Sequence, residues 1–490
     1  MKLETVATAL LIGSGIDVGI TTAWSLSNLQ VQSRLRGPLP DSINIMGPNT
    51  SEFKKATERW DTYQAPKIEM VVEPREEDDI PKIVQYCNEN GINFLAYSGG
   101  HGSTTTLGSF DGIQINMARL RNVSVDPSGN TAWVQGGSTG GSVINHLWDH
   151  GYVTPTGTAG CVGYMGLALG GGHGRLEGLY GMVSDNILQF NLVTANGTAI
   201  RVNETNHSGL YWAMRGAGHN FGIVTSAQVK IYPRGPDTWY HKTYTWRGDK
   251  LDAVFNALNQ FHGDGTTPVA MAVNTGTFLM MPNITKEEPV IFWLFEYRGT
   301  AEQAKPLLAP FDSIEAVAVD ARESTYPQLA DQPSLCGGAK RIITTAGLRT
   351  YNLTAEHQIW DGFKRRVSKN PMLTAKTIII HEGYATEGVE RTHPASSAYP
   401  FRDDRHLMQF QGNVEDSSLE AEMWEWANEV RDQWNAGQPH RAPDAYVNYA
   451  NGHESKEDWY GHQPWRLAKL RDLKAQYDPL NRFRFYNPIV

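Results

Sequence analysis

Cysteine is scarce in this sequence, with only Cys87, Cys161 and Cys336 among 490 residues. They are too few and too widely spaced for a disulfide framework or a zinc site, so we expect no structural metal. No stretch approaches the roughly 20 apolar residues that span a bilayer. The chain has a net charge of −9 at pH 7 and lacks any block of Lys and Arg. These absences favour a soluble protein that spans no membrane and binds no nucleic acid.

The N-terminal segment gives two imperfect signals. Gly13–Gly19 is similar to a dinucleotide-binding fingerprint, but it has one residue too many before its third glycine. Asp41, the acidic residue nearest the right distance, does not end a strand, so we reject a Rossmann site. The apolar run Val6–Ile12 is similar to a secretory signal, but Glu4 precedes it and Asp17 follows it. The compartment, secreted or intracellular, therefore stays open.

Glycine is abundant instead, and it is concentrated in a few turns. Two glycine-rich loops, Ser98–Gly102 and Gly170–Gly174, each follow an apolar stretch. Glycines permit positive φ and close approach of a ligand, and successive N–H groups form a concavity that binds anions. Two more such turns occur at Gln135–Gly137 and Arg215–Thr225. Four glycine-dense turns between short strands indicate a bound cofactor rather than plain tight turns.

Short strands and turns dominate the segment from Val71 to Tyr232, which predicts an α+β unit with two sheets. The helical spacing of apolar residues predicts a helix around Ile80–Cys87, followed by a short buried strand at Asn93–Tyr97. Ala195–Gly197 is a hairpin signal between two further strands.

A second region begins after the boundary signal Pro233–Pro236 and is richer in aromatic residues and long helices. Its sheet includes the strand Val290–Tyr297. Asp416 is a suitable N-cap for a helix at Ser417–Asn435, which Gly437 ends.

Five motifs occur in a fixed order along the chain: Ser98–His101, Gln135–Gly137, Leu169–Gly174, Tyr211–Thr225 and Tyr477–Phe483. In this ordered set the sequence resembles the FAD-linked oxidases of the vanillyl-alcohol oxidase superfamily, in particular the berberine bridge enzyme-like branch. The likeness extends from about Pro66 to Pro488 and so covers most of the chain.

The resemblance implies a two-lobed α+β flavoprotein. Two α/β subdomains would form a discontinuous FAD-binding lobe, and an antiparallel sheet covered by helices would form the substrate lobe. We expect the FAD-binding domain at 40–235, the substrate domain at 236–454, and a C-terminal return to the FAD-binding domain at 455–490.

The resemblance also implies FAD bonded covalently through its 8α carbon to His101. The alternative is a loop histidine that only hydrogen-bonds the backbone. Many members carry a second, cysteinyl tether where this chain has Ala159, so we expect one covalent bond and interpret Cys161 as a small packing residue. The expected cofactor-binding residues are Ser98, Gly99, Gly100, His101, Gly102, Ser103, Val162, Gly163, Gly166, Gly170, Gly171, Gly172, His173, Gly174, Gly222, Ile223, Val224 and Asn448.

Two positions near the expected flavin ring bear on reactivity. In the family a small residue at the position of Val162 is associated with fast reoxidation by dioxygen, which favours an oxidase over a dehydrogenase. Tyr164 and Met165 are larger than the family's usual residues and could reshape the cavity. His173 is either a base that approaches the ligand or a packing residue, and we favour packing.

Tyr446–Tyr449 resembles the family's Tyr-x-Asn-Tyr segment, which implies Tyr449 as the catalytic base with Gln409 beside it. A phenol with its ordinary pKa of about 10 is a poor base at pH 7 unless the site stabilises phenolate. Other members provide a cation where this chain has Leu407, and Arg405 or His406 could substitute for it. The alternative is a pair of edge-strand aromatics that pack on the sheet.

We therefore predict an FAD-dependent oxidase that acts on an alcohol or activated C–H of a small, hydrophobic natural product. Hydride would pass to flavin N5, and dioxygen would accept the electrons and give hydrogen peroxide. One alternative is a carbohydrate oxidase. Another, from a different class, is a flavin-bound cyclase or scaffold with no net redox step, and its support is the pair Tyr164 and Met165 and the absent cation at Leu407. The oligomeric state stays open.

Overall fold

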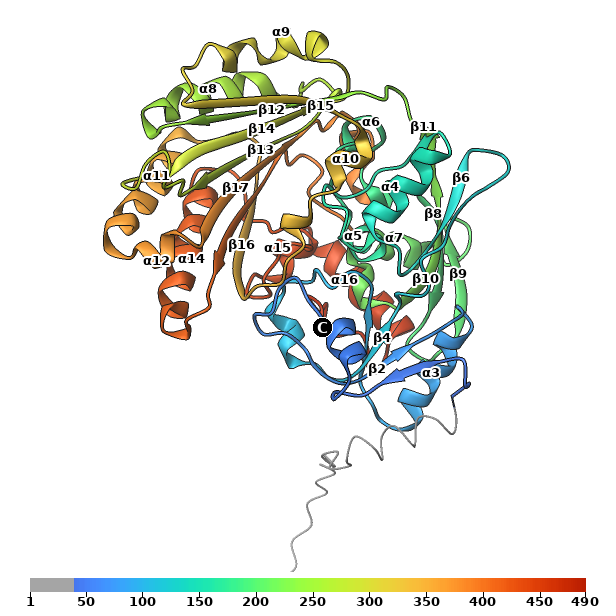
Figure 1. Cartoon of the computed structure of the whole chain (residues 1–490). Coiled ribbons are helices and arrows are strands. Elements are labelled where there is room, and N and C mark those ends of the chain that lie inside the picture. The colour runs from blue at the N-terminus through green and yellow to red at the C-terminus, as the bar shows by residue number, and fades with distance from the viewer. Residues whose placement is uncertain (1–38) are drawn as a thin grey trace, which may run out of the picture.

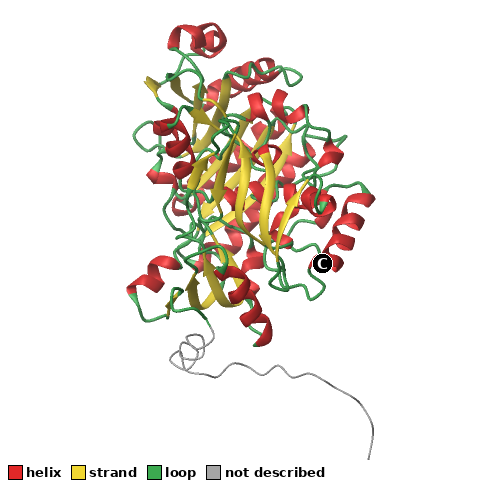
Figure 2. Cartoon of the chain, turned by 90° about the vertical axis from the view of Figure 1, so that its right-hand side faces the viewer, coloured by secondary structure: helices red, strands yellow, loops and turns green. Residues whose placement is uncertain are grey.

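The computed structural model describes residues 39–490, so both N-terminal signals, Val6–Ile12 and Gly13–Gly19, lie outside the described residues. The chain forms two lobes, which Figure 1 shows at lower right and upper left. The C-terminal segment, coloured red, returns to the first of them. In the side view of Figure 2 the strands run through the interior and most helices lie outside them.

A small sheet with the order β1-β2-β4-β3 begins the first lobe, and β2, β4 and β3 run parallel. The helix expected around Ile80–Cys87 is present and buries its apolar face. The elements are β1 Asn44–Met46, α2 Ser51–Ala56, β2 Lys67–Glu73, α3 Asp79–Glu89, β3 Phe94–Tyr97 and β4 Asp111–Asn116.

The second sheet of this lobe is antiparallel and has the order β5-β6-β10-β8-β9. The predicted hairpin at Ala195–Gly197 is confirmed, since it joins β8 to β9. The strands are β5 Val123–Val125, β6 Thr131–Gln135, β8 Ile187–Val193, β9 Ala199–Asn203 and β10 Ile223–Lys230, with a separate pair β7 Tyr152–Val153 and β11 Tyr232–Pro233.

Helices and the C-terminal segment complete the hydrophobic core of this lobe. The chain contributes to that core again from Ala445 onward, through Val447 and Ala450 to Ile489. The helices of the lobe are α4 Gly140–Asp149, α5 Tyr164–Leu169, α6 Glu177–Tyr180, α7 Ser208–Ala217, α15 Lys456–Tyr460 and α16 Pro464–Tyr477.

The second lobe contains a seven-stranded antiparallel sheet with the order β15-β12-β14-β13-β17-β18-β16. Helices cover one of its faces (Figure 1), as the resemblance implied. The strands are β12 Trp239–Trp246, β13 Met271–Leu279, β14 Val290–Tyr297, β15 Ala318–Ser324, β16 Arg341–Leu348, β17 Thr377–Tyr384 and β18 His406–Asn413. The helices are α8 Leu251–His262, α9 Ala301–Asp312, α11 Leu353–Lys369 and α14 Glu420–Ala436, with the short α10 Tyr326–Ala330, α12 Pro371–Thr374 and α13 Glu387–Glu390.

Two predictions for this lobe are confirmed by the structure. The strand expected at Val290–Tyr297 is β14 with the same bounds. Asp416 caps the expected helix by accepting a hydrogen bond from the N–H of Ser418, and Gly437 follows its end. The first turn is a 3-10 turn, and the α-helix begins only at Glu420.

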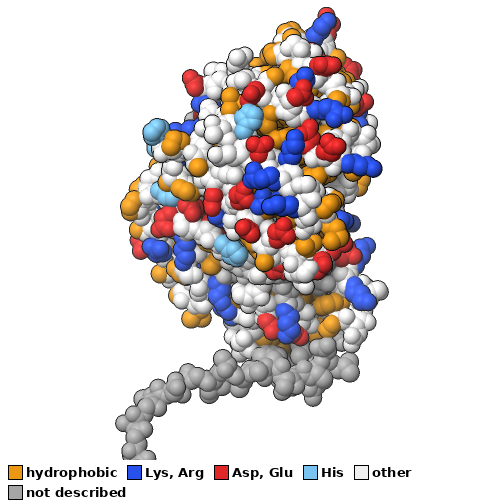
Figure 3. All heavy atoms as spheres, turned by 90° about the vertical axis from the view of Figure 1, so that its left-hand side faces the viewer, with side chains coloured by type: hydrophobic (Ala, Val, Ile, Leu, Met, Phe, Trp, Pro, Cys, Tyr) orange, Lys and Arg blue, Asp and Glu red, His pale blue; other side chains and the backbone are white. Residues whose placement is uncertain are grey.

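The helix-covered side of the second lobe faces the viewer in Figure 3. Acidic and basic side chains are interspersed there with apolar ones. Among residues 39–490 we find no helix whose length and apolar character would suit a passage through a bilayer.

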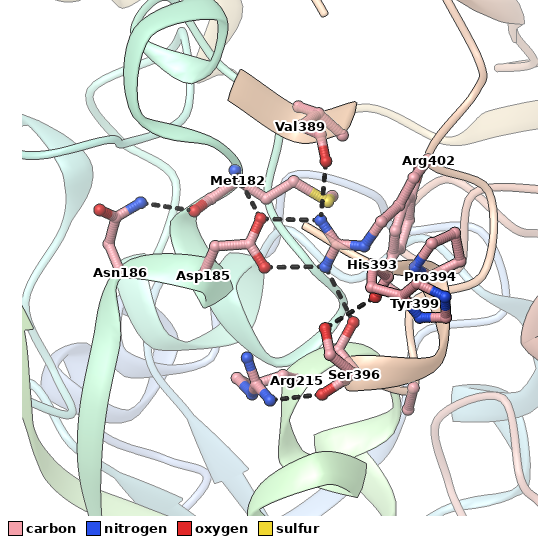
Figure 4. A network of polar contacts seen from close by, with 12 residues as sticks. Met182, Asp185, Asn186, Arg215, Val389, His393, Pro394, Ser396, Tyr399 and Arg402 are labelled. Atoms are coloured by element: carbon pink, nitrogen blue, oxygen red, sulfur yellow. Dashed lines mark hydrogen bonds and ion pairs between the residues drawn. The ribbon is translucent and has the colours of Figure 1, made fainter. Parts of the chain in front are cut away.

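Buried ion pairs join the two lobes. Arg175 of the first lobe contacts Glu296 on β14, with Nε and Oε2 2.5 Å apart, and both side chains are buried. Arg402, in the loop before β18, donates to both carboxylate oxygens of Asp185 at 2.7 and 2.8 Å (Figure 4). The same network fixes the loop that carries Tyr399 (Figure 4). These contacts set the second sheet against the glycine-rich turns of the first lobe.

Candidate active site

The loop that follows β3 carries a run of unpaired main-chain donors. The N–H groups of Gly99–Ser103 donate no hydrogen bond to a protein acceptor in the described part of the chain. Gly100 has a φ of +69°, and its carbonyl accepts from the N–H of Trp60 at 3.0 Å. Buried donors are almost always paired in a complete protein. This half-buried loop is therefore a suitable cradle for the pyrophosphate of a dinucleotide.

Glycine is required in this loop because a second glycine turn packs directly on it. A Cβ on Gly99 would lie 2.4 Å from the nitrogen of Gly163. The hydroxyl of Ser98 lies in the same contact, is buried, and has no partner among the described residues. The two turns thus form one surface with an unpaired polar atom, as expected of a site that binds a ligand.

His101 lies at the edge of this surface. Its Nδ1 is 2.9 Å from the carbonyl oxygen of Gly99, and its ring is stacked on Trp60 with centroids 5.8 Å apart. Burial lowers the pKa of His101, and the neighbouring cation Arg341 lowers it further. The ring is therefore neutral at pH 7 and has one nitrogen lone pair available as a nucleophile.

Cys161 is not the small packing residue that we expected, because it forms a disulfide with Cys336. The two cysteines are 175 residues apart, and only the approach of the two lobes brings them together. The Sγ of Cys161 is 3.6 Å from Nε2 of His101. His101, Trp60 and the disulfide line a cavity of about 660 Å³. The bridge therefore ties the second lobe to the turn beside His101.

The turn at 157–163 is held from several sides. Arg175 donates to the carbonyl of Thr158 at 2.6 Å, and Gly160 donates to the carbonyl of Ala330 in α10 at 2.9 Å. Val162 is half-buried at the end of this turn, and Gly166 in α5 has open space where a Cβ would be. Both therefore stay available to a ligand.

Tyr164 and Met165 do not crowd this space. Both side chains are almost fully buried in the core of the first lobe, on the inner side of α5. The expectation that they reshape the cavity is therefore wrong, because the register of α5 turns them inward.

The loop Gly170–Gly174 is buried and closely packed. Gly171 and Gly172 have φ values of +113° and +88°. The N–H of Gly172 donates to the hydroxyl of Tyr446, and that of Gly174 donates to Glu177. These amides already have protein partners, so the loop acts as a rigid support.

Two predicted residues depend on that support. Asn448 packs against Gly170, and its Nδ2 donates to Tyr446 at 2.7 Å, while its Oδ1 is buried without a partner among the described residues. His173 lies between Glu177 at 3.0 Å and the hydroxyl of Tyr399 at 2.8 Å. Both ring nitrogens are thus engaged, which agrees with a packing role.

Gly222, Ile223 and Val224 lie where β10 begins, between the two subdomains of the first lobe. Ile223 belongs to the core of the four-stranded sheet and Val224 to that of the five-stranded sheet. A Cβ on Gly222 would lie 2.7 Å from the carbonyl of Val193. The segment therefore joins the cores of the two sheets.

Tyr449 contacts an acid that the sequence analysis did not identify. Its hydroxyl donates to Oε2 of Glu382 on β17 at 3.0 Å, and Tyr384 donates to the same oxygen at 3.2 Å. Burial raises the pKa of Glu382 to about 7, although both hydrogen bonds act against the rise. Burial and the adjacent carboxylate also raise the pKa of Tyr449 well above its ordinary value. A tyrosinate at this position is therefore strongly disfavoured.

Gln409 lies on the same face of the sheet as Glu382. It pairs with Ile380 across β17 and accepts a hydrogen bond from Gln411. No hydrogen bond joins Gln409 to Tyr449 among the described contacts. Its catalytic role stays a prediction.

Neither Arg405 nor His406 supplies the cation that other members have at the position of Leu407. Arg405 donates to the carbonyl of Gly263, away from Tyr449. His406 lies on the other face of the sheet, stacked on Tyr351 with ring centroids 4.0 Å apart. The sequence signal for Glu382 was a charged residue that shortly follows the apolar run 378–380 within one strand.

Comparisons with known proteins agree with this geometry. A model described as "FAD binding domain" matches residues 68–203, and one described as "Berberine and berberine like" matches residues 445–490. The FAD-linked oxidoreductase iacH of Pestalotiopsis fici is 49% identical over 96% of this chain and 93% of its own length.

Solved structures share the fold. Physcomitrella patens BBE-like 1 has a TM-score of 0.78 at 21% identity, covering 95% of this chain and 99% of its own. Xylooligosaccharide oxidase from Myceliophthora thermophila C1, in complex with xylobiose, has a TM-score of 0.77 at 21% identity and the same coverage. The chain is a member of the berberine bridge enzyme-like family of FAD-linked oxidoreductases.

Proposed function

We propose that this flavoprotein is an oxidase of an alcohol or activated C–H in a small hydrophobic natural product, with dioxygen as the electron acceptor. The observation that supports the proposal is the contact between Tyr449 and Glu382, next to Asn448, which packs against Gly170. Bound FAD would supply the hydride acceptor.

The acid and the tyrosine would act together as one proton acceptor. The substrate proton goes to the hydroxyl oxygen of Tyr449, while the proton of that hydroxyl goes to Oε2 of Glu382 along the existing 3.0 Å hydrogen bond. No free tyrosinate is then required, so the absent cation at Leu407 is not a defect. A group with a pKa near 7 is well suited to general base catalysis at neutral pH.

His101 and the unpaired amides of Gly99–Ser103 would hold the cofactor. The neutral imidazole would bond to the flavin 8α carbon, and the amides would bind the pyrophosphate. Ala159 leaves His101 as the single covalent attachment, because the thiol two residues further on is engaged in the disulfide. The residues at Val162 and Gly166 would leave one side of the ring open to dioxygen.

The two alternatives have less support. A carbohydrate oxidase remains the alternative within the class, but the xylooligosaccharide oxidase is 21% identical, which supports the fold alone. The cyclase or scaffold depended partly on Tyr164 and Met165, and both are now placed in the core.

Anaerobic titration of the purified holoprotein tests the proposal. Aromatic and aliphatic alcohols are added, flavin absorbance is recorded, and air is then admitted while hydrogen peroxide is assayed. We expect bleaching by at least one alcohol and peroxide in equal amount, with Tyr449→Phe and Glu382→Gln both slowed. A bleached flavin that air does not reoxidise would indicate a dehydrogenase. A flavin that no alcohol bleaches would contradict the oxidase.

A further inference from the structure

The face of the seven-stranded sheet that the helices leave uncovered carries an apolar surface. We call it the apolar floor, and it consists of Leu279, Phe292, Leu294, Ile378 and Ile380. All five side chains are half-buried, and none belongs to a hydrophobic core cluster of the described chain. Their immediate neighbours along the strands behave differently. Ile291, Trp293, Phe295, Phe278 and Ile379 point the other way and are buried beneath the helices.

Strand register places the floor in line with the candidate catalytic acid. Glu382 on β17 pairs with Thr275 on β13, which in turn pairs with Leu294 on β14. Residues directly opposite on neighbouring antiparallel strands point to the same face. The acid and Leu294 therefore belong to one cross-strand row.

A second row runs parallel to the first. Gln409 pairs with Ile380, which pairs with Thr277, and Thr277 pairs with Phe292. Each row begins at a polar side chain of the candidate site, crosses a threonine on β13 and ends at an apolar side chain on β14; the second row also includes Ile380. Neighbouring strands are about 4.8 Å apart, so the surface extends about 10 Å from Glu382 to Leu294.

We propose that the apolar floor binds an extended apolar arm of the substrate, whose reacting group lies at Glu382 and Tyr449. This inference rests on the proposed function, because it assigns that site a substrate class. An amphipathic molecule with an oxidisable polar head and a flexible hydrocarbon arm matches both ends of the rows. The only polar side chains between the ends are Thr275 and Thr277, too few to pair the many hydroxyls of an oligosaccharide.

The chemistry of the floor supports an apolar occupant over water. The half-buried Phe, Leu and Ile side chains of the floor cannot form hydrogen bonds with water, and covering their remaining exposed surface releases ordered solvent. Continuity with Glu382 and Gln409 identifies the occupant as the molecule that reacts there, since a ligand held at the acid extends over the next strands without a change of face.

The experiment is isothermal titration of the holoprotein with phenols that carry para-alkyl arms from methyl to heptyl. We expect the dissociation constant to fall about fourfold for each methylene that reaches the floor. Phe292→Ser and Leu294→Ser should each reduce this dependence on arm length and leave binding of the methyl compound within about twofold. Thermal unfolding and flavin content of both variants verify folding.

Val319→Ser is the matched control. Val319 is 54% exposed on the same sheet and pairs with Tyr244, on the face that the helices cover. It should bind the whole series like the wild type. An affinity that does not change with arm length in the wild type would overturn the inference and would mean that something else, such as a second copy of the chain, covers the floor.

The two proposals fail separately. A steep dependence on arm length without flavin reduction by any alcohol would contradict the oxidase and keep the floor as a binding surface. Flavin reduction by short alcohols with no gain from longer arms would contradict the floor and keep the oxidase. Glu382→Gln should slow flavin reduction and leave the dependence on arm length intact.

Discussion

Replacement of Glu382 by Gln should stabilise the fold at neutral and alkaline pH while it impairs catalysis. Burial raises the pKa of this carboxyl from 4.5 to about 7. Between these values the folded protein holds a proton that the unfolded chain releases, so stability falls as pH rises and is constant above both values. The shift corresponds to about 3 kcal/mol, which is the most that the charged carboxylate costs the fold at pH 8.

Glutamine keeps the acceptor for Tyr449 and Tyr384 and removes the charge. Urea unfolding of Glu382→Gln should therefore show a gain of about 2–3 kcal/mol over the wild type at pH 8 and almost none near pH 4. Glu323→Gln, at the exposed edge strand β15, is the control and should leave the unfolding free energy unchanged at both pH values. Glu382→Gln should also reduce flavin about 10²- to 10⁴-fold more slowly than the wild type.

The wild-type rate should rise with pH through about 7, because the carboxylate is the acceptor form. This inflection should disappear in Glu382→Gln. Equal stability of the two proteins at pH 8, or an inflection that survives the substitution, would refute the assignment of the proton to this acid.

Other predictions concern the link between the lobes and the cofactor loop. Cys336→Ser should lower the unfolding free energy by up to about 5 kcal/mol, because the disulfide closes a loop of 175 residues, and an unchanged melting temperature would contradict this. Arg175→Met leaves Glu296 charged and buried, so urea unfolding should show a loss of about 3–5 kcal/mol, whereas a loss below about 1 kcal/mol would show that water reaches the pair. Gly99→Ala introduces a Cβ 2.4 Å from a main-chain nitrogen and should abolish flavin binding, whereas Gly337→Ala, in open space, should retain it.

Elements with strong local signals could be predicted from the sequence. The strand Val290–Tyr297 and the hairpin at Ala195–Gly197 depend on β-branched, aromatic and turn residues that act over a few positions. The helix after Asp416 was predicted for the same reason. Its 3-10 first turn could not be predicted, because the choice between a 3-10 and an α-helical first turn depends on packing.

Contacts between distant segments could not be predicted. Cys161 and Cys336 are brought together only by the approach of the two lobes. Glu382 and Tyr449 are 67 residues apart, and no local pattern in a single sequence predicts their contact. The apolar floor could not be predicted for another reason. Because β14 is apolar on both faces, its sequence predicts a strand that is buried on both sides.

Acid precipitation of the purified protein tests the central claim, that the glycine turns hold FAD and His101 anchors it. The yellow colour should stay with the wild-type pellet and pass into the supernatant with His101→Ala, and mass spectrometry should locate the flavin on the peptide that contains His101. Colour released from the wild type would contradict the covalent bond, and a colourless protein would contradict the flavin site itself.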